Sequence, residues 1–146
     1  MKEAKIILVE DDPDHAELII DILETEDIDS EVVLIKDGQQ ALNYLQNTDI
    51  DEEHGLKSQV GLIVLDLNLP KVNGMEVLKF IKKNSAYCST PVVILSTSSD
   101  ETTIADAYKN GANDYITKPI SYDEFVEKVK LLREQWLISN ELLRKD

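Results

Sequence analysis

The chain of 146 residues has a single cysteine, Cys88, which excludes an internal disulfide and a zinc site built from several thiolates. Basic residues are also few: the chain has 15 lysines and arginines and 29 acidic residues, which gives a formal net charge of −14. Binding to nucleic acid or to anionic lipid needs a basic surface, so we expect no nucleic acid and no membrane among the partners. The sequence also lacks the roughly 18-residue apolar run of a membrane-spanning helix. Its first residues, MKEAKIILVEDD, have no long apolar run before their acids, so we expect no signal peptide. We therefore expect a cytoplasmic protein.

The acidic charge is concentrated in one half of the chain. Residues 1–60 contain 17 acids and four bases, whereas residues 61–146 contain 12 acids and 11 bases. An acidic half favours solubility, and it is equally typical of a pocket that binds a cation or faces a basic partner. The length predicts one domain, residues 1–146. Within it we expect a core from about 5 to 133 and a C-terminal helical extension from about 134 to 146.

Short apolar segments alternate with segments of helical spacing. Runs rich in isoleucine, valine and leucine, typical of strands covered on both faces, are Lys5–Glu10, Glu31–Ile35, Gly61–Leu65, Pro91–Ser96 and Asp114–Thr117. Helical spacing appears in Pro13–Thr25, Gln39–Gln46, Asn73–Asn84 and Asp100–Asn110, and a fifth helix is expected after Ser121. This alternation predicts an α/β fold of the flavodoxin-like class, with a doubly wound five-stranded parallel sheet of order 2-1-3-4-5 and five helices.

Local signals add detail to this fold. Asp12 before Pro13 is typical of an N-cap, and Ser98 and Ser121 each precede a glutamate by three residues, as in a capping box. The polar, acidic stretch 47–60 is expected to be an insertion loop. Because no glycine or proline follows Ser121, the last helix is expected to reach about Arg144, or roughly 36 Å at 1.5 Å per residue. Trp136 and its apolar neighbours would then extend beyond the sheet.

Polar residues follow four of the predicted strands at their carboxyl ends, where open α/β sheets place their sites. They are Glu10, Asp11, Asp12, Asp66, Ser96 and Lys118. Singly, each fits a cap, a turn or a strand end, but together they favour phosphoryl chemistry. Clustered carboxylates need a compensating cation, and Mg²⁺ prefers carboxylate and phosphate oxygens. Asp66 can act as a nucleophile, while Lys118 and Ser96 stabilise the transferring phosphoryl group.

Four segments of the chain resemble the receiver domain of two-component response regulators. They are ILVEDDP, LIVLDLNLPKVNGMEVL, PVVILSTS and GANDYITKPI, which stand in the family's order and spacing, and the resemblance extends from Lys5 to about Arg133. It implies that Asp66 accepts a phosphoryl group from the phosphohistidine of a sensor histidine kinase. The family more often has threonine at Ser96, where serine keeps the hydroxyl, and phenylalanine at Ile120.

The resemblance also implies roles for individual residues. A Mg²⁺ site would be formed by Asp11, Asp12, Asp66 and the backbone carbonyl of Asn68. Ser96 and Lys118 would hold the phosphoryl group. Tyr115 would change rotamer on activation, and the peptide bond before Pro119 would be cis. The chain further resembles the small regulators that serve bacterial phytochrome kinases, and this resemblance implies a phytochrome as a partner. It rests on three features: the 47–60 loop, the string LDLNLPK and the string QWLIS near the end of the chain.

The sequence departs from the patterns of two other functions. A phosphatase that forms an aspartyl phosphate carries a second aspartate two residues after its nucleophile, but this position is Asn68. A binding module without phosphorylation would not need the full set of site residues. The sequence therefore favours a phosphoryl acceptor over a turnover enzyme. His15 and His54 lack ligand partners at useful spacing and are expected to be solvated, and Cys88 is expected to be partly buried.

The sequence says less about how the protein passes its signal to other molecules. Only 28 residues follow Lys118, too few for a winged-helix domain, so we expect a stand-alone receiver without a DNA-binding output domain. Such a protein either changes its surface on phosphorylation or relays the phosphoryl group onward. We expect a homodimer through the fourth helix, fifth strand and fifth helix, in line with how receivers often pair, with the C-terminal apolar residues adding to the interface.

Overall fold

The five apolar runs form one parallel sheet in the computed structural model, which describes residues 4–24, 30–47, 50–51, 55–56 and 60–138. The strands of this sheet are β1 (Ala4–Val9), β2 (Ser30–Ile35), β5 (Val60–Leu65), β6 (Val92–Ser96) and β7 (Asp114–Thr117). Their spatial order is β2-β1-β5-β6-β7. This confirms the predicted order 2-1-3-4-5 and the doubly wound class.

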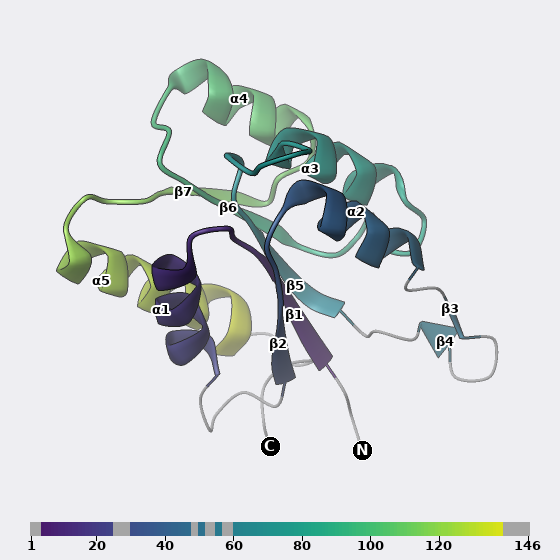
Figure 1. The fold of residues 1–146 in the computed structure, drawn as a ribbon, viewed down its shortest axis with the longest axis horizontal. Coiled ribbons are helices and arrows are strands. Elements are labelled where there is room, and N and C mark those ends of the chain that lie inside the picture. Colours follow the sequence, from purple (N-terminus) through teal and green to yellow (C-terminus); the bar gives the residue numbers. More distant parts are fainter. Residues whose placement is uncertain (1–3, 25–29, 48–49, 52–54, 57–59, 139–146) are drawn as a thin grey trace.

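Helices cover both faces of the sheet. They are α1 (Pro13–Leu23), α2 (Gly38–Asn47), α3 (Gly74–Lys83), α4 (Glu101–Lys109) and α5 (Tyr122–Arg133). Helices α1 and α5 lie on one face, and α2, α3 and α4 lie on the other (Figure 1). None of the helices in the described ranges is long and apolar enough to cross a membrane.

The two-sided covering explains why the strands read as continuous apolar runs. Ile7 and Val9 of β1 pack into the core under α2, α3 and α4, whereas Ile6 and Leu8 pack into the core under α1 and α5. Successive side chains of a strand point to opposite faces, so both faces require apolar residues. All six residues of β5 are buried for the same reason.

Two of the three expected helix caps are present. The Asp12 carboxylate accepts hydrogen bonds from the backbone N–H groups of Asp14 and His15, and the Ser121 hydroxyl accepts one from Glu124. The capping box predicted at Ser98 is wrong, because α4 begins two residues later than that box requires, with Asp100 as its N-cap. The Ser98 hydroxyl instead accepts a bond from the Asp100 N–H at 3.3 Å, which tightens the preceding turn.

The insertion between α2 and β5 contains a structure that its sequence did not indicate. Two short strands, β3 (Ile50–Asp51) and β4 (Gly55–Leu56), pair in antiparallel fashion outside the main sheet. Two-residue strands in a polar stretch show no apolar alternation, and this is the signal on which a strand prediction depends. The expected insertion loop is therefore in part a small hairpin.

The C-terminal helix departs from the prediction in a way that changes its role. Helix α5 ends at Arg133 and continues as one π-helical turn, η1 (Glu134–Ile138). Regular spacing would place Trp136 after Leu132 on the core face, but a π turn inserts an extra residue and brings Leu137 there instead. Leu137 is fully buried and Trp136 packs beside it. The expectation that these residues extend beyond the sheet is wrong, and Leu142 and Leu143 lie outside the described residues.

Candidate functional site

Four buried polar side chains meet at the carboxyl edge of the sheet. They are Glu10 after β1, Asp66 after β5, Ser96 at the end of β6 and Lys118 after β7. Backbone hydrogen bonds continue the sheet past its strands, from Asp66 N to the Val9 carbonyl at 3.0 Å and from Lys118 N to the Ser96 carbonyl at 2.7 Å. These bonds fix the directions in which the Asp66 and Lys118 side chains leave the sheet. The structure thus brings together the predicted nucleophile, hydroxyl and ammonium.

Lys118 is the electrostatic centre of this group. Its ammonium donates hydrogen bonds to Glu10 Oε1 at 2.7 Å and to Asp66 Oδ2 at 3.3 Å. All three side chains are at least nine-tenths buried. A buried charge is tolerated only when it is paired and hydrogen-bonded, so the two carboxylates hold the ammonium in place and are themselves held by it.

Burial has a marked effect on Glu10. Burial raises the pKa of this carboxyl, and the neighbouring charge of Asp66 adds to the rise. The hydrogen bond and the charge of Lys118 lower the pKa, and the result of all these effects is a pKa of about 7. Glu10 therefore gains and loses a proton close to neutral pH. A divalent cation at this edge would have to displace that proton.

Glu10, Asp11 and Asp66 form an acidic group suited to a divalent cation. One potential ligand atom from each lies within 4.8 Å of the others, and Asp11 is exposed to solvent. Carboxylate oxygens in such an arrangement are the ligands of hard cations, and their mutual repulsion favours an added positive charge. The structure thus offers a metal site that is buried on one side and open on the other.

Asp12, which we also expected as a metal ligand, is not part of this acidic group of Glu10, Asp11 and Asp66. Its carboxylate caps α1, and the hydrogen bond from the His15 N–H holds the pKa of Asp12 below its usual range. The spacing alone could not tell which two of three successive acids face the sheet edge. Glu10 takes the place that we expected for Asp12, because Glu10 directly continues β1.

We expect cation affinity to depend on pH through Glu10. Because the cation competes with the Glu10 proton, the affinity for Mn²⁺ should rise about tenfold per pH unit below the pKa of about 7 and level off above it. Calorimetric titration between about pH 5.5 and 8 measures this. The variant Glu10→Gln, which has no proton to displace, should bind more weakly and show a flatter profile. Equal affinity of the parent at the two ends of the range contradicts the assignment.

Asn68 closes the other side of Asp66. Its backbone N–H donates to Asp66 Oδ1 at 3.0 Å, which orients the carboxylate. Its side-chain amide lies 3.2 Å from the Thr97 hydroxyl oxygen and 3.5 Å from that of Ser96. Asn68 therefore connects the end of β5 to the end of β6, across the space into which a phosphoryl group on Asp66 would extend.

Tyr115 and Pro119, the remaining predicted residues, lie beside this core. The Tyr115 hydroxyl donates to the Ser98 carbonyl at 2.8 Å, and Ser98 N donates in turn to Ser96 Oγ at 3.2 Å. A short chain of contacts thus joins Tyr115 to the site. The peptide bond before Pro119 is trans, so the expected cis bond is wrong. The free-energy preference between the two isomers is only about 0.5–1 kcal/mol for bonds to proline, so sequence alone does not decide between them.

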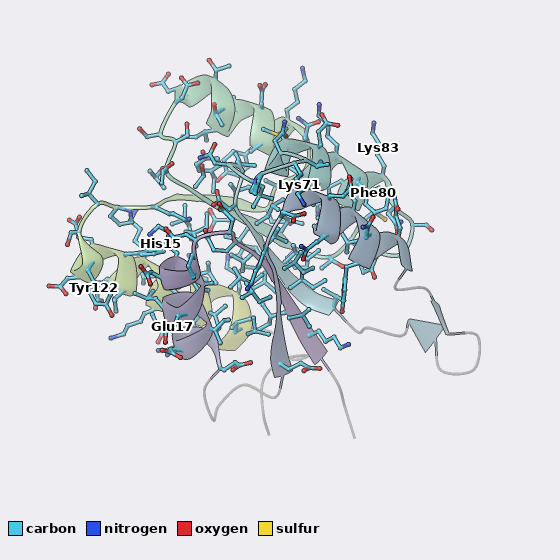
Figure 2. All side chains as sticks on the ribbon, in the orientation of Figure 1. His15, Glu17, Lys71, Phe80, Lys83 and Tyr122 are labelled. Atoms are coloured by element: carbon cyan, nitrogen blue, oxygen red, sulfur yellow. The ribbon has the colours of Figure 1, made fainter. Side chains whose placement is uncertain are left out.

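His15 is a neighbour of the site that the sequence did not reveal. We expected it to be solvated, but this residue at the start of α1 (Figure 2) is half-buried. Its Nδ1 lies 3.2 Å from the Lys118 ammonium. One signal was available: the next residue on α1, Ala16, belongs to the apolar face, so His15 borders that face near the helix start. Cys88 is exposed rather than partly buried, and His54 lies outside the described residues.

Known proteins are similar to this chain over most of its length. A family profile described as the response regulator receiver domain matches residues 6–130. The chain is 38% identical over 132 residues to FilR2, named as a methanogenesis regulatory protein of Methanothrix harundinacea, and covers 83% of it. It is 36% identical over 132 residues to the response regulator Rcp1 of Synechocystis sp. and covers 88% of that protein. Each match spans 90% of the present chain.

Solved structures agree with the sequence matches. The Mn²⁺-bound form of Rcp1 superposes with a TM-score of 0.83 at 36% identity, over 92% of this chain and 95% of that one. The phosphorylated cyanobacterial phytochrome response regulator RcpA superposes with a TM-score of 0.81 at 38% identity, over 97% of this chain and 98% of that one. These similarities cover the sheet, its helices and the edge at which the acidic group lies.

Proposed function

The chain belongs to the response regulator receiver domain family, and on that premise we propose that Asp66 accepts a phosphoryl group from the phosphohistidine of a sensor histidine kinase. The reaction depends on Mg²⁺. Phosphorylation then alters the surface next to Tyr115, and this altered surface is the signal that partners read.

One observation carries this proposal: the Asp66 carboxylate is buried between a cation and two further acids. Lys118 approaches one of its oxygens at 3.3 Å, and the Asn68 N–H approaches the other at 3.0 Å. A carboxylate serves as a nucleophile toward phosphorus when it is oriented and when the charge of the incoming group is neutralised nearby. The edge of the sheet supplies both conditions.

The transfer is a displacement at phosphorus. An Asp66 oxygen forms a bond to phosphorus as the bond from phosphorus to the donor imidazole nitrogen breaks, and the imidazole keeps the electron pair. The imidazole departs as the neutral ring when its other nitrogen already carries a proton, so it needs none from this chain. Lys118 turns one N–H from Asp66 toward a phosphoryl oxygen, and the Ser96 hydroxyl donates to another. The product is an acyl phosphate on Asp66.

The acidic group fits the metal that this reaction uses in the family. Glu10, Asp11 and Asp66 would hold Mg²⁺, together with the backbone carbonyl of Asn68, and the bound ion would neutralise charge on the phosphoryl oxygens. Without it, the acids themselves would repel an incoming phosphoryl group. This is the physical reason to expect phosphorylation to depend on the metal.

The kinase is inferred from the relatives. RcpA is described as a cyanobacterial phytochrome response regulator, and RtBRR, at 38% identity over 91% of this chain, as a bacteriophytochrome response regulator. We infer that the kinase partner of the present chain is also of the phytochrome type. Because Asn68 stands where an aspartyl phosphatase would carry a general acid, the chain acts as a phosphoryl acceptor with slow hydrolysis at most.

Chemical phosphorylation tests this function without knowledge of the kinase. Incubation with acetyl phosphate and Mg²⁺ should add one base-labile phosphoryl group per chain, and addition of a chelator should prevent it. Intact-protein mass spectrometry counts the groups. Multiple turnovers of acetyl phosphate with no labelled protein would indicate a phosphatase, and no reaction at all would indicate a binding module.

We expect Ser96→Ala to separate phosphorylation from response. A phosphoryl group of about −1.5 to −2 charge on Asp66 should draw the Ser96 hydroxyl inward and disturb the contacts through Ser98 to Tyr115. The alanine variant should still accept phosphate, yet the phosphorylation-induced NMR shifts of the Tyr115 ring should largely disappear. Ser99→Ala, at an exposed position, is the control. Shifts of parental size in Ser96→Ala would remove this hydroxyl from the switch.

The proposed dimer interface rests on the face formed by α4, β7 and α5, and no longer on Trp136. Leu131 of α5 is exposed there beside Thr117 at the end of β7, and Tyr108 of α4, whose hydroxyl contacts Asp114 of β7, is nearly half exposed. Such exposed large apolar residues are typical of protein interfaces. A dimer through this face would place Tyr115 beside the contact, so phosphorylation would tighten it.

Sedimentation velocity at tens of micromolar should therefore show association of the parent that increases on phosphorylation. Leu131→Glu should shift the protein toward monomer, because it places a charge in an apolar contact. The control is Lys130→Glu, an exposed neighbour that carries the same new charge. A parent that stays monomeric in both phosphorylation states contradicts the dimer.

A further inference from the structure

His15 contacts the reactive edge from outside the acidic group. It lies in the first turn of α1, and its ring meets the Phe125 ring of α5 edge-on, with centroids 5.0 Å apart and planes at 81°. Its Nδ1 lies 3.2 Å from Lys118 Nζ, within hydrogen-bond distance. The Asp12 carboxylate oxygen, at 3.7 Å from the same nitrogen, is too far for a hydrogen bond. Lys118 is therefore the closer partner of this nitrogen.

The chemistry of the two groups determines the direction of this bond. A lysine ammonium has three donors and no acceptor, so the bond to Lys118 requires Nδ1 of His15 to be the acceptor. A neutral imidazole that accepts at Nδ1 carries its proton at Nε2. The geometry thus assigns both the neutral form and the Nε2–H tautomer to His15.

The partners of Lys118 differ in what happens to them during the reaction. Its three N–H groups face three acceptors, namely Glu10 Oε1, Asp66 Oδ2 and His15 Nδ1. Asp66 becomes phosphorylated and Glu10 belongs to the acidic group that would take the metal. Both must change partners during the reaction. His15 alone among these three acceptors has no other part in that chemistry.

We propose that His15 is a positioning residue for Lys118, an inference that rests on the proposed phosphorylation of Asp66. Its Nδ1 keeps the ammonium at the carboxyl end of β7 while Glu10 turns to the metal and Asp66 takes up phosphorus. The ammonium then needs only to redirect one N–H, from the Asp66 oxygen to a phosphoryl oxygen. Preorganised charge of this kind stabilises a transition state without reorganisation at the moment of transfer.

Two substitutions separate this role from packing. His15→Phe keeps an aromatic ring against Phe125 but removes the acceptor nitrogen, whereas His15→Gln gives up the ring and keeps an acceptor oxygen. Glu17→Gln, on the exposed side of α1, is the matched control (Figure 2). Loss of an outer partner that orients a group at a metal site typically costs on the order of 10- to 100-fold. We therefore expect His15→Phe to lower the maximal rate of phosphorylation by acetyl phosphate at saturating Mg²⁺ about tenfold.

The pattern across the variants decides the proposal. His15→Gln should recover most of the lost rate, Glu17→Gln should match the parent, and the half-saturating acetyl phosphate concentration should change little in all of them. A general packing defect would instead affect His15→Gln as much as or more than His15→Phe. A parental rate in His15→Phe, or equal losses in the two His15 variants, would overturn the proposal.

NMR of the parent tests the contact independently of activity and of the folding of any variant. The His15 ring nitrogens should show the Nε2–H tautomer, and the Lys118 ammonium should give a signal protected from exchange that is lost in His15→Phe. A protonated Nδ1, or an unprotected Lys118 signal in the parent, would overturn the inference. If the parent accepts no phosphate, the proposed function fails, and with it the positioning role; the NMR result then decides the contact alone.

Discussion

Replacement of Asp66 by asparagine is expected to abolish phosphorylation and leave the protein folded. The amide of asparagine is not a nucleophile toward phosphorus, so no acyl phosphate can form at this position. Its carbonyl oxygen still accepts the Asn68 N–H bond that Asp66 Oδ1 accepts in the parent. The variant also removes the negative charge that raises the pKa of Glu10, so this pKa should fall below its parental value of about 7.

Acetyl phosphate labelling of the parent and of Asp66→Asn, followed by intact mass, measures this effect. Asp106→Asn, an exposed position on α4, is the control for the loss of one carboxylate and should be labelled like the parent. Thermal unfolding checks that each variant is folded. Persistent labelling of Asp66→Asn at the parental level would place the acceptor elsewhere.

The second large effect is expected at Gly74, the first residue of α3. An added Cβ would lie 2.2 Å from the Asp66 carbonyl oxygen and 2.5 Å from Leu67 Cα, and both of these are backbone atoms. In most helices alanine is more stable than glycine by up to about 1 kcal/mol. Here the clash should outweigh that gain, and Gly74→Ala should lower the free energy of unfolding by about 1–3 kcal/mol. The displaced backbone belongs to Asp66 itself, so slower phosphorylation should accompany the loss.

Urea unfolding of Gly74→Ala measures this loss against the parent. Lys83→Ala, at an exposed position of the same helix, should change the free energy of unfolding by less than about 0.5 kcal/mol. A Gly74→Ala protein as stable as the parent would mean that α3 does not approach the end of β5 as closely as described.

The sheet could be predicted from the sequence because its signals are redundant. The central strands β1, β5 and β6 are apolar runs covered on both sides, as Ile6 and Ile7 illustrate by packing into different cores. Parallel strands joined by short helical connections allow few orders. The same topology predicted that three site residues lie close together, because each of them ends or directly follows a strand. These residues are Asp66, Ser96 and Lys118.

The details of the site could not be predicted, because they depend on side-chain direction. Glu10, Asp11 and Asp12 are consecutive acids, and although the sequence indicated Asp12 as the cap of α1, only the structure shows that Glu10 faces Lys118. His15 lies in contact with a residue 103 positions away, and no local pattern reports such a distant partner.

The C-terminal prediction failed for a different reason. Regular helical spacing was assumed past Arg133, but the π turn η1 shifts the phase by one residue and buries Leu137. The segment Glu134–Ile138 contains no proline or glycine that would indicate an interruption of the helix. Packing of Leu137 into the core under α1 and α5 therefore overrides the local pattern.

The most direct test of the account is the chemical identification of the phosphorylated residue in the unaltered protein. After incubation with acetyl phosphate and Mg²⁺, borohydride reduces an aspartyl phosphate to homoserine, and peptide mass spectrometry locates the product. The account predicts homoserine at position 66 alone, formed with Mg²⁺ and absent when a chelator is present. Homoserine at another aspartate, or equal yields with and without the metal, would contradict it.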